Sequence, residues 1–455
     1  MTNSLESELS RFITELDWDD VPAHVQARVL DIWVDTLANA LAGRRAANTP
    51  VIQQLADRLC GPGESTVIGG GTASLTAAAL LNGHQITAFT MCDVYRPALC
   101  HITPEVVPAV LAVAEGGEVN GRELLTGLAI GLEVTARLGL GVDYAGFRAR
   151  GWHAPGVIGT IGAACAAARV IGLNDRGVRA AMGLGVSQAS GTFAALGTPA
   201  VKFHQARGAV SGLWAALFTA DGLGGTENGL THPDGGLLST YVDGGRPDLV
   251  TRELGTRWEL EQISLRRWPA ASSLQSLVAV LLESTHSGDV DAVEIMLPST
   301  PFAMCAEMGW QDELSAMQSA RYVTAAVLRD RRCWIEQFDA VHRTDAELSE
   351  FATNRVRVVR DENLPPSGVR VRLICGGQTS ELRRNRAPGE PDEPLTPEQI
   401  RAKLDNACAG TPIVAAERLD DVVTRVGERA ANAVCADLRS AGASRGVDRE
   451  YASQH

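Results

Sequence analysis

A histidine stands directly before the most distinctive helical stretch of the chain. His153 lies between Trp152 and Pro155, and proline is typical of a first helical turn. The positive end of the helix dipole favours the neutral form of an imidazole placed there. A neutral imidazole accepts a proton near neutral pH, as a general base must. His153 is therefore a candidate general base, and the alternative is a packed histidine at a helix entry.

A second stretch, residues 90–105, is denser in chemically active side chains than folding requires. It carries Asp93, Tyr95, Arg96 and His101. The segment is expected to be a loop between two helices, and such loops often hold catalytic groups. His101 is the second candidate acid or base, with Asp93 as the carboxylate that orients a histidine.

Cations gather near two expected helix ends. Lys202, His204 and Arg207 open a helix, and Arg148 and Arg150 precede His153. Such groups suit the binding of a carboxylate. Each one alone is more often a solvated surface residue.

Other chemistries lack their motifs. The histidines show neither His-x-x-x-His nor His-Glu-x-x-His spacing, so no metal site is predicted. A Gly-x-Ser-x-Gly elbow is also absent, which leaves a serine hydrolase unsupported. Histidines accompanied by cations fit acid/base chemistry without a cofactor best.

The helix after His153 is expected to lie at the centre of a helical core. Gly156, Gly159 and Gly162 recur at three-residue spacing among alanines. Glycine weakens a helix interior, but this spacing makes a smooth face on which a neighbouring backbone can pack closely. Other helices are predicted over residues 4–16, 22–43, 74–82, 104–116, 121–138, 174–191 and 204–222, with a short extended segment and turn over 66–71.

The predicted secondary structure changes from helices to a mixture of strands and helices after residue 262. Alternating residues predict strands over 290–297 and 368–374, and Gly376-Gly377 predicts a hairpin turn into 378–382. Residues 312–329 are predicted to be a helix between these strands. A Pro-rich linker ends at Pro394, and Thr396 caps a further helix. A last helix is predicted over 417–440.

We therefore predict a mainly α protein with two domains. The large all-α domain comprises residues 1–262 and 395–455, and a smaller α+β domain comprises residues 263–394. The 455 residues suffice for this organisation.

The composition of the chain limits which binding partners and which cellular compartment we expect. The formal net charge is -13, so general attraction to nucleic acid or an anionic membrane is not expected. The N-terminus lacks an apolar signal core, and the nine cysteines are scattered without a Cys-x-x-Cys pair. These features indicate reduced thiols in a cytoplasmic protein.

At these same stretches the chain resembles the MmgE/PrpD family, which includes 2-methylcitrate dehydratase, cis-aconitate decarboxylase and iminodisuccinate epimerase. The resemblance covers nearly the whole chain. It rests on segments 67–71 and 77–83, 96–101 with 106–115, 151–153 with the Gly/Ala helix, 187–191 and 389–399. It implies an all-α domain built from both chain ends, an α+β lid domain and a homodimer. It also implies a cleft between the domains that works on a small molecule without metal or organic cofactor.

The resemblance carries only part of the family's site onto this chain. The family's Asp-x-Asp-Asp-Thr loop reads Thr90 to Val94 here, so that only Asp93 remains. The following family histidine is His101, and the Gly-Trp-His histidine is His153. The family's Lys-x-x-His has Val201 in place of its lysine; Lys202 is displaced by one residue and His204 is kept.

The remaining positions lie in the lid domain. The family's Lys-Pro-Tyr-Pro corresponds to a segment starting at Arg266, which keeps the charge but does not donate a proton readily. The family's next histidine corresponds to Gln275, and its lid tyrosine is kept as Tyr322. Tyr322 is thus expected to donate a proton or a hydrogen bond.

The sequence therefore predicts a cofactor-free lyase or isomerase acting on a carboxylate-type small molecule. The catalytic candidates are His101, His153, Tyr322 and Asp93, and the substrate-binding candidates are Arg96, Arg148, Lys202, His204, Arg266 and Gln275. The lost lysine removes a charged hydrogen bond of about 1.5–3 kcal/mol, so 2-methylcitrate and cis-aconitate are not the expected substrates. The alternatives are an isomerase or cyclase of specialised metabolism, and a non-catalytic homologue that acts as a binding protein.

Overall fold

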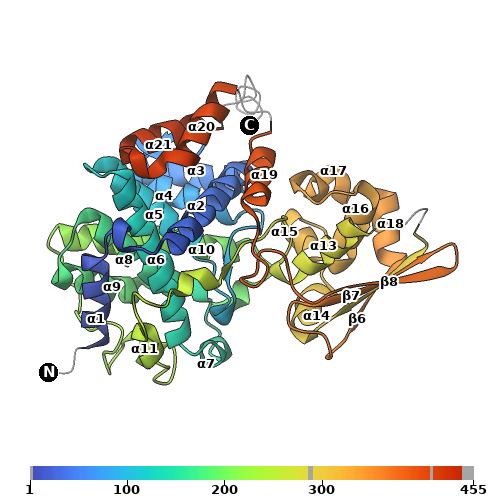
Figure 1. The fold of residues 1–455 in the computed structure, drawn as a ribbon, viewed down its shortest axis with the longest axis horizontal. Coiled ribbons are helices and arrows are strands. Elements are labelled where there is room, and N and C mark those ends of the chain that lie inside the picture. The colour runs from blue at the N-terminus through green and yellow to red at the C-terminus, as the bar shows by residue number, and fades with distance from the viewer. Residues whose placement is uncertain (1–3, 285–289, 410–412, 443–455) are drawn as a thin grey trace. The chain divides into compact units, whose positions relative to one another are not determined.

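The computed structural model describes residues 4–284, 290–409 and 413–442. This part of the chain forms two compact units (Figure 1). The larger one contains the residues up to Ala88, Cys92–Ile263 and the residues from Ile400 onward, and the smaller one contains Phe89–Met91 and Ser264–Gln399. The sequence predicted these divisions after residues 262 and 394.

The larger unit is helical. Its main helices are α1 (Leu5–Glu15), α2 (Ala23–Gly43), α3 (Thr49–Cys60), α4 (Leu75–Thr87), α5 (Thr103–Gly116), α6 (Gly121–Gly141), α7 (Tyr144–Ala149), α8 (Thr160–Ile171), α9 (Asp175–Gln188), α10 (Ala200–Ala220), α11 (Leu237–Thr240), α12 (Asp248–Thr251), α20 (Ile413–Arg425) and α21 (Ala431–Ser440). Strands are few: β1 (Ser65–Val67) and β2 (Gly71–Ala73) form a small hairpin, and β3 (Val94–Tyr95) lies in the loop before α5.

Helix α8 is central to this unit, as its glycines and alanines predict. It packs against α5, α6, α9 and α10, and every residue from Thr160 to Ala168 is buried. A Cβ added at Gly162 would lie 1.7 Å from Thr135 Oγ1, and one added at Gly212 of α10 would lie 2.6 Å from Ala163 Cβ. Only glycine permits these approaches, because real Cβ atoms do not come so close to their neighbours.

Arg137 and Glu133 of α6 form a buried ion pair that also bonds the backbone of residues 250–260. Arg137 Nε donates to Glu133 Oε1 at 2.5 Å, and both side chains are almost fully buried. Arg137 also donates to main-chain carbonyls of the 250–257 segment, while Glu133 accepts the backbone N–H groups of Glu259 and Leu260. Both charges are thus satisfied by hydrogen bonds, which a buried pair requires.

The smaller unit is built on a four-stranded sheet in the order β6-β5-β7-β8. The strands are β5 (Ala292–Leu297), β6 (Val356–Arg360), β7 (Val369–Cys375) and β8 (Gln378–Arg384). β5 runs parallel to β6 and antiparallel to β7. The predicted hairpin joins β7 to β8 through Gly376 and Gly377, whose φ angles of 56° and 77° suit glycine.

Helices pack on this sheet. α13 (Gln275–Glu283) contacts β7 and β8, and α16 (Ala320–Asp330) and α18 (Ala346–Asn354) contact β6 (Figure 1). The remaining short helices of the unit are α14 (Ser299–Cys305), α15 (Glu313–Gln318) and α17 (Ala340–Arg343). The prediction of a mainly α protein with a smaller α+β domain is confirmed.

Several details of the prediction differ from the structure. The helix expected over 312–329 is two helices, because Ser319 is extended and caps α16 through its side chain. The helix expected over 417–440 is also two, separated by a 3-10 turn, η8 (Val426–Glu428). α10 begins at Ala200 rather than at residue 204, and β6 was not anticipated.

Helix α6 is the one helix in the described ranges that is long and apolar enough to cross a membrane. In this fold 94% of its apolar window is buried inside the protein. That burial is typical of the core helix of a globular domain.

Candidate active site

His153 is held by the backbone at the entry of the central helix. The chain passes from His153 into a π-turn, η3 (Pro155–Gly159), which runs on into α8. The backbone N–H of His153 donates to Gly191 O at 3.0 Å, and its ring meets the Phe193 ring edge-on at 6.0 Å between centroids. A π-turn inside a helix often marks a functional position. The predicted placement of His153 before the Gly/Ala helix is confirmed.

The glycine face beside His153 admits a neighbouring segment. A Cβ at Gly156 would lie 2.3 Å from Ser190 O and 3.3 Å from His204 Cβ. The absence of a side chain at Gly156 therefore lets α10 bring His204 against η3.

His153 and His204 form a direct pair. Their Nδ1 atoms are 3.3 Å apart and their ring centroids 5.3 Å apart. Burial, together with the nearby charges of His101, His204, Lys202 and Arg148, lowers the pKa of His153 to about 3. Burial and the charge of Arg207 also lower the pKa of His204. Both imidazoles are therefore neutral at pH 7 and able to accept a proton.

Lys202 turns into the larger unit and not out to solvent. Its side chain approaches α4, where Nζ donates to Thr87 Oγ1 at 3.4 Å, and the residue is only 7% exposed. Val201, at the family's lysine position, is 8% exposed and apolar. The displaced lysine thus supplies a buried positive charge beside the histidine pair.

A buried histidine that the sequence analysis missed lies on α4. His84 is 3% exposed, and neither ring nitrogen has a hydrogen-bond partner among the described residues. Burial and the charge of Lys202 lower its pKa to about 4. The hydrophobic pattern of α4 gave no signal for it, because every residue from Ala77 to Thr87 is buried.

Asp93 caps a helix with its carboxylate and contacts His101 through its backbone carbonyl. The Asp93 carboxylate accepts from the N–H groups of Ile102 and Thr103 and from Thr103 Oγ1, at 2.7–3.0 Å, and so caps α5. The Asp93 backbone carbonyl contacts His101 Nδ1 at 2.5 Å. Burial raises the pKa of Asp93, against these hydrogen bonds. That Asp93 orients a histidine stays a prediction, and its backbone carbonyl makes one contact with His101.

Three arginines frame this region. Arg148 lies 3.5 Å from the centre of the Phe193 ring, a cation–π contact. Arg207 donates to Gln188 O, Gly156 O and Ser190 O and so ties the end of α9 to η3. Arg96 is half-buried in a 3-10 turn, η2 (Arg96–Ala98).

The other predicted site residues belong to the smaller unit. The Tyr322 hydroxyl donates to Gln337 O at 2.6 Å, and the residue is fully buried. The Gln275 side-chain amide bonds the main chain. Its Oε1 accepts from the backbone N–H groups of residues 267 and 268, and its Nε2 donates to the carbonyls of residues 268 and 270. In this structure the polar atoms of both side chains bond the backbone, and the substrate roles expected of Tyr322 and Gln275 stay predictions. Arg266 is 2% exposed at the start of the loop that Gln275 holds.

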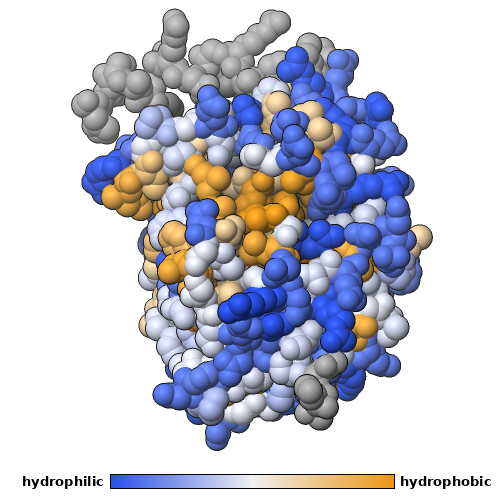
Figure 2. Space-filling model, turned by 90° about the vertical axis from the view of Figure 1, so that its left-hand side faces the viewer, coloured by the Kyte–Doolittle hydropathy of each residue, from blue (hydrophilic) through white to orange (hydrophobic). Residues whose placement is uncertain are grey.

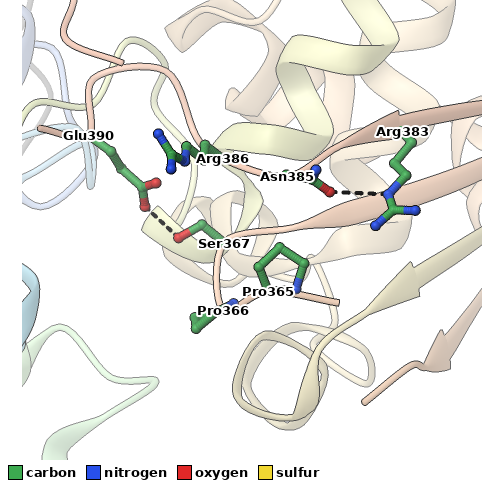
Figure 3. Close-up of a pocket in the computed structure, with 7 residues that line it drawn as sticks. All are labelled: Pro365, Pro366, Ser367, Arg383, Asn385, Arg386 and Glu390. Atoms are coloured by element: carbon green, nitrogen blue, oxygen red, sulfur yellow. Dashed lines mark hydrogen bonds between the residues drawn. The ribbon is translucent and has the colours of Figure 1, made fainter. Parts of the chain in front are cut away.

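The smaller unit also has a surface pocket (Figure 3). Arg383 donates to Asn385 Oδ1 at 3.1 Å, and Ser367 bonds to Glu390 across it. The remaining lining residues are Pro365, Pro366 and Arg386. The pocket offers no imidazole, thiol or lysine, so the candidate chemistry stays with the histidines of the larger unit.

No group of three or more His, Cys, Asp or Glu residues suited to a metal ion occurs within residues 4–284, 290–409 and 413–442.

Comparisons with known proteins match both units. The MmgE/PrpD N-terminal domain model matches residues 7–249, and the MmgE/PrpD C-terminal domain model matches residues 269–427. The chain is 26% identical to the cis-aconitate decarboxylase-like protein oryM of Aspergillus oryzae, over 93% of this chain and 94% of that protein. It is 25% identical to cis-aconitate decarboxylase of Aspergillus terreus over 74% of each chain, and 26% identical to the human cis-aconitate decarboxylase over 72% of each.

Proposed function

The chain belongs to the MmgE/PrpD family, and on that premise we propose that it is a lyase or isomerase that moves a proton on a carboxylate small molecule. The observation that carries the proposal is the pair of neutral imidazoles of His153 and His204 beside the buried ammonium of Lys202. A neutral imidazole can take a proton from carbon next to a carbonyl or carboxylate. The relatives' names, cis-aconitate decarboxylase and a protein like it, support the lyase class.

In this proposal His153 is the general base and His101 returns the proton. The cations Lys202 and Arg148 attract the substrate carboxylate, since the charge of each acts on His153 and lowers its pKa. Binding an anion would offset those charges, raise the pKa of His153 and strengthen it as a base. Arg96 and Arg266 are proposed further carboxylate contacts. The chemistry needs no metal or organic cofactor.

The proposed substrate carries less charge than 2-methylcitrate or cis-aconitate. Thr90 replaces a carboxylate of the family pattern, and Val201 replaces a lysine. Lys202 supplies a charge from a neighbouring position. The second candidate is therefore an isomerase or cyclase of specialised metabolism, and the third is a homologue that binds a carboxylate without turning it over.

Proton exchange tests the proposal. The protein is incubated in D2O with tricarboxylates, dicarboxylates and less polar unsaturated acids, and deuterium uptake into carbon is followed by mass spectrometry. Uptake that is lost in the His101→Ala, His153→Ala double variant supports the proposal. Uptake that persists in that variant removes both histidines from the mechanism. Absence of uptake with carboxylate binding retained favours the non-catalytic homologue.

A homodimer is proposed as the working state, in the cytoplasm. Trp214 and Phe218 of α10 are 38% and 44% exposed with ring centroids 6.3 Å apart, and Leu223 beyond them is 55% exposed. Figure 2 shows that hydrophobic side chains also gather on one face of the molecule within hydrophilic surroundings. Exposed apolar patches mark protein contacts. Light scattering should give twice 48.2 kDa, and the monomer mass would contradict the proposal.

A further inference from the structure

His84 is a polar side chain that the fold buries without satisfying it. The residue is 3% exposed, and both ring nitrogens lack a hydrogen-bond partner in the described part of the chain. A neutral imidazole carries one donor and one acceptor. Buried polar groups are nearly always paired, so an orphan of this kind calls for an explanation.

The surrounding backbone fixes His84 in place. A Cβ at the neighbouring Gly83 would lie 2.9 Å from Ala206 Cα and 2.9 Å from Pro104 O, so α4 packs backbone against backbone on α10 and α5. On the other side of His84, the Gln85 carbonyl oxygen would lie 1.9 Å from a Cβ at Gly43. Helices packed this tightly hold the backbone of His84 in place.

Lys202 links His84 to the candidate active site. Its Nζ bonds Thr87 Oγ1, one helical turn after His84 on α4. The charge of Lys202 lowers the pKa of His84 and also that of His153. One buried ammonium therefore acts on the unsatisfied imidazole and on the proposed general base.

We propose that His84 is a substrate-binding residue that, together with Lys202, holds one carboxylate group of the substrate. A carboxylate gives the ammonium an opposite charge and gives the imidazole N–H an acceptor, and both bonds gain from the ion's charge. The neighbouring Thr87 Oγ1 accepts from Nζ and keeps the ammonium directed along α4. This inference rests on the proposed function and adds to it the residues that choose the substrate, since a molecule without a carboxylate at this point leaves His84 unsatisfied.

The direct test observes His84 itself. The protein is labelled with 13C at histidine Cε1, and its NMR spectrum is recorded while cis-aconitate, succinate, crotonate and, separately, chloride are added. The His84 signal is assigned by its loss in His84→Leu. We expect a carboxylate to shift this signal and to raise the pKa of His84 above about 4. If none of the carboxylates moves the signal, or if chloride moves it equally, the proposal is overturned.

Variants separate this inference from the catalytic proposal. His84→Leu and Lys202→Met should each weaken carboxylate binding about tenfold or more, the loss expected of one charged hydrogen bond. Their effects should be less than additive in the double variant, because the two residues share one ligand group. His84→Gln, which keeps an N–H donor, should restore part of the affinity. His24→Leu is the matched control, since the His24 side chain is 68% exposed.

The two proposals fail in different ways. Carboxylate binding that shifts His84, without deuterium exchange, removes the catalytic function and leaves the inference standing. Exchange that proceeds with unchanged KM in His84→Leu leaves the function standing and removes the inference.

Discussion

The Nδ1 atoms of His153 and His204 lie 3.3 Å apart, so one imidazole must carry the hydrogen that the other accepts. Two protonated rings at this distance would repel each other. The pair therefore works with a single proton between the two Nδ1 atoms. Protonation of both rings would disrupt the pair, because each Nδ1 atom would then carry a hydrogen, and this has a consequence for the pH dependence of activity.

The acidic limb of the pH profile should lie far below the ordinary histidine range. Because the pKa of His153 is lowered to about 3, the base stays neutral as the pH falls from 8 to 5. We expect kcat/KM for deuterium exchange, which reports the free enzyme, to show no loss from this group over that interval. An anionic substrate raises the pKa, so kcat should fall at a higher pH than kcat/KM does. A kcat/KM limb at the ordinary value of 6.5 that disappears in His204→Gln would contradict this assignment.

A buried carboxyl should make the protein less stable as the pH rises. Glu105 is fully buried, and its carboxyl oxygens bond no other residue in the described ranges. Burial, with Asp93 and Cys92 nearby, raises its pKa well above 4.5. The folded state thus holds a proton that the unfolded chain releases above pH 4.5, and stability falls as pH rises toward the folded pKa.

Glu105→Gln tests this dependence. Relative to the variant, the wild-type free energy of unfolding should decrease by about 1.4 kcal/mol per pH unit above 4.5. Urea unfolding at pH 5, 6 and 7 measures the slope. Parallel curves for the two proteins would show that Glu105 is ionised in the fold.

Asp93→Ala should lower the stability of the protein more than it lowers the rate of deuterium exchange. The carboxylate caps α5 with three hydrogen bonds, and its loss should cost about 1–3 kcal/mol. His101 Nδ1 contacts the Asp93 carbonyl, which alanine retains. Exchange per folded molecule should therefore stay within about threefold of the wild type. Asn174→Ala is the matched control, because it removes the single cap bond of α9. If Asp93→Ala instead loses most of its exchange at unchanged stability, Asp93 has a catalytic role.

The buried pair of Lys403 and Asp35 should respond asymmetrically to substitution. Lys403 Nζ donates to Asp35 Oδ1 at 2.6 Å, both side chains are 1% exposed, and Asn39 donates to the other oxygen at 2.9 Å. Lys403→Met leaves a buried carboxylate uncompensated and should lower the free energy of unfolding by about 3–5 kcal/mol. The double variant Asp35→Leu, Lys403→Met should recover much of that loss in urea unfolding. Equal losses in the single and double variants would show that the pair is not coupled.

Restoring the family's charges should change the ligand preference. Thr90→Asp with Val201→Lys returns a carboxylate and an ammonium to the positions where the family pattern has them. Thr90 has a φ of 56°, a conformation that aspartate tolerates better than threonine. Calorimetry should show tricarboxylate affinity rising about tenfold relative to the uncharged control Thr90→Asn, Val201→Met. Equal affinities would remove these two positions from substrate selection.

The helices of the larger unit were predictable because their signals are local. The glycine spacing of 156–162 identified the central helix, and the proline after His153 identified its start. The direction of Lys202 was not predictable, because α10 begins four residues earlier than its periodicity suggested and neighbouring residues on a helix point about 100° apart. That angle decides which of residues 201 and 202 faces α4.

The unpredicted parts of the site depend on burial. Every residue of α4 from Ala77 to Thr87 is buried, so hydrophobic periodicity gave no reason to notice His84. Tyr322 was expected to act on substrate because its residue type is kept, yet its bond to Gln337 depends on a chain segment 15 residues away. Strand β6 pairs in parallel with β5 across a long connection, and such pairing leaves no local turn signal.

The last helix has a consequence for the order in which the protein assembles. Arg439 of α21 donates to Thr66 Oγ1 and pairs with Glu115, and Gly69 N–H donates to Leu438 O. Strand β1, the turn at Gly69 and helix α5 thus contact residues that are synthesised only after the whole smaller unit. The smaller unit, continuous in sequence apart from Phe89–Met91, can complete its sheet first. During synthesis the surfaces of α5 and β1 that α21 covers remain open for the time needed to translate several hundred residues, and that interval is when a chaperone would be needed.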